Sequence, residues 1–89
     1  MPVVRIPSPL RPHTGGLDSV EADGSTVGQV LGGLGTQYPA LRERIFDGED
    51  LRRFVNVYVN NEDIRYLEDL ETAVAPGDEV SIIPAVAGG

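Results

Sequence analysis

The chain has 89 residues, with 14 acidic residues against 7 basic ones, a net charge of −7 and no cysteine. This length supports one domain with a modest core, and the lack of cysteine excludes disulfides, thiolate metal sites and a nucleophilic thiol. The negative charge repels phosphate backbones, and no signal-peptide pattern or run of roughly 18 apolar residues occurs, so we expect a cytoplasmic protein that binds neither nucleic acid nor membrane.

The first 22 residues predict a β-hairpin. Val3–Ile6 is a short β-prone run that ends at Pro7, because proline cannot donate to a strand ladder. Leu10–Gly16, with the sequence LRPHTGG, is rich in turn-forming residues and predicts a turn. Leu17–Ala22 then predicts the second strand.

A helix is predicted next, beginning at Thr26 and capped by Asp23 or Ser25. Apolar residues recur at the spacing of one buried helical stripe, at Val27, Val30, Leu31, Leu34 and Tyr38. Each of the four glycines in this segment costs about 1 kcal/mol relative to alanine in a helix interior. We therefore expect the helix to depend on packing across a sheet. Pro39 starts a second, short helical turn, and residues 47–50 form an acidic loop.

The clearest strand is Arg53–Asn60, with the sequence RFVNVYVN, in which three valines alternate with other residues and predict a buried face. A turn then leads to a short strand near Asp63–Arg65, an irregular stretch over residues 67–75 and a last strand at Glu79–Pro84. The order of hairpin, helix, strand, short strand and strand predicts an α+β fold, in which one main helix packs across a mixed sheet. We expect this domain to span residues 1–84 and a flexible tail to span 85–89.

The tail ends in Gly88 and Gly89 and is the first candidate site. No side chain beyond Val86 is bulky, so Val86, Ala87 and Gly88 can thread a narrow channel of a partner. The terminal carboxylate of Gly89 is ionised at neutral pH and can attack the α-phosphate of ATP once an enzyme positions both. A chain without lysine has no P-loop, so a partner must bind the ATP. A frayed chain end is the alternative.

A second candidate is the outward face of the sheet beside the tail. Strand alternation points Ile83, Phe54, Tyr58 and Arg5 to this face, which we interpret as a partner-docking patch rather than scattered surface residues. His13 is the only histidine and lacks neighbouring metal ligands. The clustered acids resemble ordinary solvated surface. We therefore predict a protein that is not an enzyme and has no catalytic residue, no metal and no bound cofactor.

Three segments carry a family resemblance, namely LRPHTGG at 10–16, RFVNVYVNNEDIR at 53–65 and PAVAGG at 84–89. In these segments and in the order of its elements, the chain resembles the MoaD/ThiS family of prokaryotic ubiquitin-like sulfur carriers, and above all the members that serve cysteine biosynthesis. The resemblance implies a β-grasp fold. It also implies that an E1-like adenylating and sulfurtransferase enzyme uses ATP to convert the Gly89 carboxylate to a thiocarboxylate.

The resemblance further implies that the sulfur passes to an O-phosphoserine-dependent cysteine synthase and that a zinc metallopeptidase releases the cysteine adduct. ATP and zinc then belong to the partner enzymes. Two alternatives stay open: a MoaD-like small subunit of molybdopterin synthase, and a ubiquitin-like modifier joined to lysines of other proteins.

Overall fold

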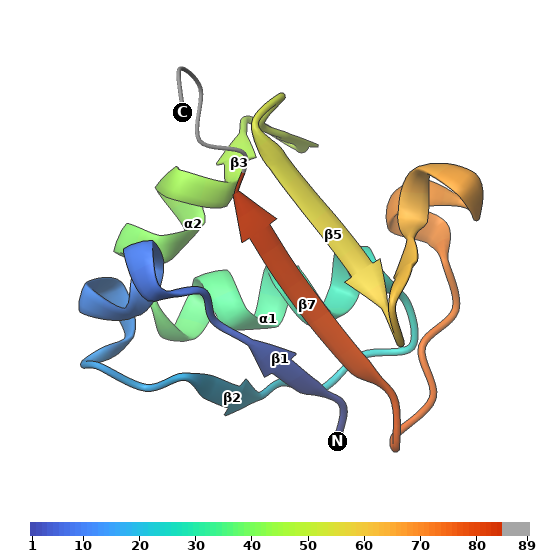
Figure 1. The fold of residues 1–89 in the computed structure, drawn as a ribbon, viewed down its shortest axis with the longest axis horizontal. Helices are drawn as coiled ribbons and strands as arrows, with labels where there is room; N and C mark the ends of the chain where they lie inside the picture. Colours follow the sequence, from blue (N-terminus) through green and yellow to red (C-terminus); the bar gives the residue numbers. More distant parts are fainter. Residues whose placement is uncertain (85–89) are drawn as a thin grey trace.

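The computed structural model describes residues 1–84, which form a five-stranded mixed sheet with helices on one face (Figure 1). The strands lie in the order β2, β1, β7, β5 and β6. β1 runs parallel to β7, and the other neighbours are antiparallel. Their bounds are β1 Val3–Arg5, β2 Ser19–Glu21, β5 Val55–Val59, β6 Glu62–Asp63 and β7 Glu79–Pro84. The predicted α+β arrangement is confirmed.

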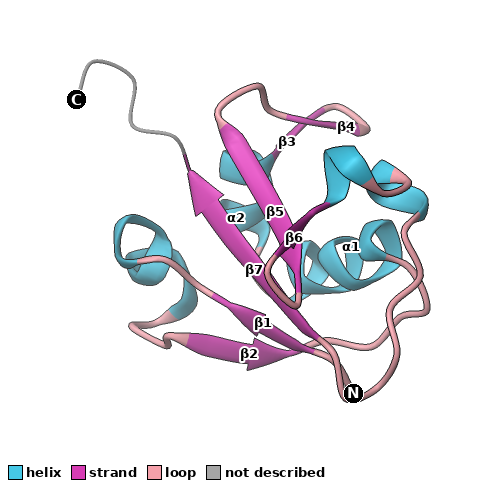
Figure 2. Cartoon of the chain, turned by 45° about the vertical axis from the view of Figure 1, so that its right-hand side comes forward, coloured by secondary structure: helices cyan, strands magenta, loops and turns pink. Residues whose placement is uncertain are grey.

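The main helix is α1 (Val27–Gln37), which crosses the sheet and is followed directly by α2 (Pro39–Ile45) (Figure 2). The predicted caps were wrong. The cap is Thr26, whose side-chain oxygen accepts a hydrogen bond from the Gln29 N–H at 3.2 Å. Ser25 lies one position outside the helix, where its own N–H donates to the Gln29 side chain at 2.8 Å.

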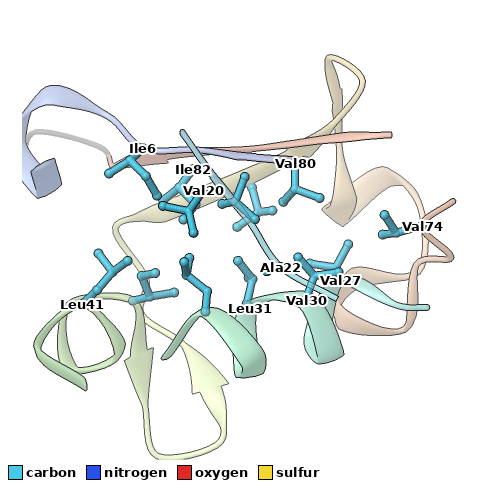
Figure 3. Packing of buried hydrophobic residues seen from close by; sticks show 14 of the residues in the cluster. Ile6, Val20, Ala22, Val27, Val30, Leu31, Leu41, Val74, Val80 and Ile82 are labelled. Atoms are coloured by element: carbon cyan, nitrogen blue, oxygen red, sulfur yellow. The ribbon is translucent and has the colours of Figure 1, made fainter. Parts of the chain in front are cut away.

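The core lies between the sheet and the two helices (Figure 3). The helix contributes the predicted stripe, although Tyr38 at its end is only partly buried. The predicted inward strand residues are buried, namely Val4, Val57, Val59, Val80 and Ile82, whereas Val55 is only partly buried. Because side chains alternate along a strand, this parity points Ser81 and Ile83 away from the core.

The segment LRPHTGG is not the turn that we predicted but most of a 3₁₀ helix, η1 (Ser8–Thr14). Leu10 and Thr14 are buried, and the Thr14 hydroxyl donates to the backbone carbonyl of Arg11 or of Leu17, at 3.1 and 3.0 Å. Gly15 ends the helix with a φ of 69°, in the left-handed region that favours glycine. Pro9 fits the first turn, which needs few N–H donors, whereas Pro12 lies inside the helix and donates no hydrogen bond there.

Several other boundaries differ from the prediction. The acidic residues 47–50 form the tip of a hairpin between β3 (Phe46–Asp47) and β4 (Asp50–Leu51). The short strand lies at 62–63 rather than 63–65, because the Asp63 carboxylate accepts from the Arg65 N–H and starts the 3₁₀ helix η2 (Ile64–Tyr66). The irregular stretch contains a third such helix, η3 (Asp69–Glu71). The strands β1, β2 and β5 are each shorter than predicted.

Candidate functional site

The outward sheet face is organised around Ser81 in the middle of β7. Arg5 of β1 lies opposite Ser81 on one side, and Tyr58 of β5 lies opposite it on the other. Residues directly opposite each other share a sheet face, so these three side chains form a row across the sheet. Ile83 lies two residues further along β7, opposite Asn56, and 48% of its surface is exposed. The structure therefore brings three of the four predicted patch residues onto one face.

Phe54 lies at the end of this face rather than within it. It occupies a turn before β5, which the Val55 N–H closes by donating to the Arg52 carbonyl at 3.0 Å. Phe54 is 58% exposed and lines a hollow together with Arg44, Arg52 and Pro84. Since Val55 pairs with Pro84, the last residue of β7, this hollow lies where the chain leaves the sheet.

An ion pair borders the row at its β6 end. Asp63 lies opposite Tyr58 and holds the Arg65 guanidinium at 2.8 Å. Hydrogen bonds from the side chain of Arg65, and then from its backbone N–H, hold the pKa of Asp63 below its ordinary value. The carboxylate therefore stays charged at neutral pH, and the outward face carries a fixed ion pair beside an aromatic ring.

Gly89, predicted to carry the chemistry, and Val86, Ala87 and Gly88, predicted to thread into a partner, lie outside the described residues, and so does the predicted tail as a whole. The domain boundary at residue 84 and the threading of the tail stay predictions. Among residues 1–84, no three histidine, cysteine, aspartate or glutamate side chains gather as metal ligands. In the same part of the chain, no helix is long and apolar enough to cross a membrane.

Residues 4–89 match the ThiS family. The chain belongs to this family. The sulfur carrier protein CysO of Mycobacterium tuberculosis is 53% identical over 97% of this chain and 96% of its own length. In the crystal structure of the Amycolatopsis orientalis BexX/CysO complex, a chain that is 46% identical matches with a TM-score of 0.93 over 100% of both chains. The fold is thus the ubiquitin-like β-grasp.

A more distant relative has a different name. Small archaeal modifier protein 3 of Haloferax volcanii is 39% identical over 75% of this chain and 73% of its own length. The ThiS-family chain is therefore similar both to sulfur carriers, which are not themselves enzymes, and to a ubiquitin-like modifier.

The sequence reading missed Arg44 and Arg52, the two cations beside Pro84. One signal was available for Arg44, because Leu41 and Ile45 occupy the buried side of α2 and leave Arg44 exposed. No local pattern shows that the end of α2 lies close in space to Pro84, which is about half the chain away in the sequence.

Proposed function

We propose that this ThiS-family protein carries sulfur as a thiocarboxylate on the C-terminal carboxylate of Gly89. The observation that supports this most strongly is the 53% identity to the sulfur carrier CysO over nearly the whole of both chains. The family match also extends through residue 89, and therefore includes the Gly88–Gly89 end. A chain without cysteine has no side-chain thiol to carry a persulfide, which leaves the terminal carboxylate as the carrier group.

The proposed chemistry has two steps, both on partner enzymes. The carboxylate first attacks the α-phosphate of ATP on an E1-like enzyme, forming an acyl adenylate and releasing pyrophosphate. Sulfide, HS⁻, then attacks the acyl carbon and displaces AMP, which leaves the thiocarboxylate with no change of oxidation state. The protein itself supplies a folded domain, a docking face and a C-terminal end with small side chains. Binding through the outward face converts the attack into an effectively intramolecular reaction.

The docking face that we propose consists of Ile83, Tyr58, Arg5 and Phe54. It combines exposed apolar side chains with a cation, as protein interfaces commonly do. Its position supports the role, because Ile83 and Pro84 are the last two residues of β7 and lead directly into the tail. A partner bound there holds the start of the tail at a fixed distance from its own active centre.

The recipient of the sulfur that we propose is an O-phosphoserine-dependent cysteine synthase, with a zinc metallopeptidase releasing the cysteine adduct from Gly89. The support is the resemblance of three segments to carriers for cysteine biosynthesis and the identity to CysO. Incubating the thiocarboxylate form with the synthase and O-phosphoserine is expected to give a protein that is one cysteinyl unit heavier than the unmodified carboxylate form, because O-phosphoserine supplies the carbon skeleton, loses its phosphate and takes the sulfur from the thiocarboxylate. An unchanged mass, with the synthase active on another sulfur donor, would contradict this recipient.

ATP–pyrophosphate exchange tests the first step. With the E1-like enzyme from the same source, we expect exchange that depends on this protein and is lost when Gly89 is deleted. Leu17→Ala is the matched control, because Leu17 is 47% exposed but lies outside both the docking face and the tail, and it is expected to retain exchange. Full exchange by the Gly89 deletion would refute the assignment of the carboxylate.

Protein modification is a second candidate, favoured by the similarity to small archaeal modifier protein 3. The same acyl adenylate can form an amide with a lysine of another protein. The absence of lysine from this chain is compatible with both functions, since no lysine of its own can capture the activated end. Because Arg65 is the last trypsin site, tryptic digestion leaves residues 66–89 attached to a modified lysine. Lysine peptides that carry this segment, found in cells that express the protein and lost with the Gly89 deletion, are expected only from the modifier.

A further inference from the structure

A hollow with a distinct chemistry lies along the outer edge of β5, on the side away from β7. Its base follows Val55–Val57, and its walls include Leu51 and Ile64. Three arginines line it: Arg52, Arg53 and Arg65. The hollow lies across β5 from the Ser81 row and β7. It shares Arg52 and Val55 with the hollow beside Pro84, but the proposed sulfur chemistry uses none of its residues.

The strand edge that this hollow follows is only partly covered. β6 pairs with β5 at Tyr58 and Val59 alone, whereas β7 pairs with all five residues of β5. Within residues 1–84, Val55–Val57 therefore have a strand partner on one side only. The Asn60 N–H donates to the Glu79 carbonyl on the β7 side at 2.9 Å. By alternation, the backbone groups of Val57 and the Val55 carbonyl point towards the hollow.

The charge of the hollow differs in sign from that of the whole protein. It holds three of the 7 basic residues and only two of the 14 acidic ones, Asp63 and Asp69. The Asp63 carboxylate is already paired with Arg65 at 2.8 Å. The Arg52 Nε donates to the Glu43 carbonyl at 2.8 Å, which holds this guanidinium in place. The hollow is thus a local basic region on an acidic protein.

We propose that this hollow binds a short, extended, acidic segment of a partner protein, which adds to the sheet as a strand beside Val55–Val57. An added strand gains main-chain hydrogen bonds from an uncovered edge and places alternate side chains into flanking pockets. The two apolar walls suit a β-branched residue, and the three arginines suit carboxylates on either side of it. A basic partner has no carboxylates for the arginines, and a nucleic acid cannot add to the sheet as a strand.

A peptide with alternating acidic and β-branched residues, acetyl-EVEIE-amide, serves as the probe. Titration by NMR is expected to shift the amide signals of residues 55–57 and 64–65. Acetyl-EPEPE-amide carries the same charge but cannot form a strand, because proline lacks the N–H. Acetyl-KVKIK-amide keeps the strand pattern and reverses the charge. We expect neither control to shift these signals.

Charge reversal in the protein tests the arginines directly. The double variant R52E/R53E is expected to weaken binding of the EVEIE peptide by at least about tenfold, since it replaces attraction by repulsion at the rim. R44E and R42E combined change the net charge equally, on helix α2, and are expected to leave the affinity unchanged. Binding should also weaken as salt is added.

Four results would overturn the proposal. Equal binding of the EPEPE peptide would show plain ionic attraction without strand addition, and unaltered binding by R52E/R53E would remove the arginines from the site. No binding of the EVEIE peptide at all would leave the edge without its proposed ligand. Self-association in sedimentation equilibrium, lost in R52E/R53E, would assign the hollow to a second copy of this chain instead.

Discussion

Ile83 is the residue of the docking face whose contribution to the free energy of partner binding can be worked out from the structure. Truncation to alanine removes three side-chain carbons, and 48% of Ile83 is exposed and available for burial by a partner. At about 0.8 kcal/mol for each buried carbon, the half that a partner covers is worth about 1.2 kcal/mol. Ile83→Ala is therefore expected to weaken binding of the E1-like enzyme by about sevenfold.

Steady-state adenylation kinetics measure this effect. Because the face is bound equally before and during the reaction, the KM for this protein should rise about sevenfold while kcat stays unchanged. Leu17→Ala is the matched control: Leu17 is 47% exposed but lies outside the docking face, between η1 and β2. An unchanged KM for Ile83→Ala, or an equal rise for Leu17→Ala, would refute the reasoning.

Three further predictions concern the helix, the pH dependence and the tail. Thr26→Ala removes the cap of α1 and should cost about 1 kcal/mol, lowering the melting temperature by about 4–8 °C in calorimetry, whereas Thr26→Ser should not. Hydrogen bonds hold the pKa values of Asp63 and Asp78 below normal. The two carboxylates therefore stabilise the fold at pH values above their unfolded pKa of about 3.9, and this stabilisation is lost as the pH falls through their folded pKa values. The urea concentration at the unfolding midpoint should therefore decrease as the pH is lowered below about 4. This decrease should be less steep for Asp78→Asn. Gly88→Leu should block thiocarboxylate formation in mass spectra without changing the melting temperature, because a bulky side chain cannot enter a narrow channel.

The strands, and the direction in which their side chains point, could be predicted because apolar residues alternate with other residues along each strand. Val57 and Val59, like Val80 and Ile82, repeat with the period of a strand, and all four are buried. The same alternation correctly points Ile83 outward. The β-grasp fold followed from the order of elements and from three family-like segments, which is information that periodicity alone does not contain.

The glycines of α1 show what local reasoning cannot reach. Propensity counts them only as a cost. In the structure, a Cβ at Gly35 would lie 2.9 Å from the Arg42 side chain, and one at Gly28 would lie 3.2 Å from the Leu70 carbonyl oxygen. These glycines let α2 and η3 approach the main helix closely. Gly28 and Leu70 lie far apart in the sequence, and Gly35 and Arg42 lie in two different helices, so helix propensity alone does not predict these contacts.

The ends of short elements were mispredicted for a related reason. The short strand was predicted near 63–65, but Asp63 is its last residue, because the Asp63 side chain caps the turn that follows. Phe54 shares strand parity with Tyr58, yet the turn closed by the Val55 N–H delays the start of β5 until Val55. In both places, one hydrogen bond decides where regular structure stops.

The central claim is that Gly89 carries sulfur, and the intact mass of the protein tests it most directly. The protein is incubated with ATP, a sulfur source and cytosolic extract from its own source, and fragmentation then locates any change. The account predicts a mass gain that corresponds to one oxygen replaced by sulfur, confined to Gly89. A terminal carboxylate that stays unmodified, while the extract loads another carrier under the same conditions, would contradict it.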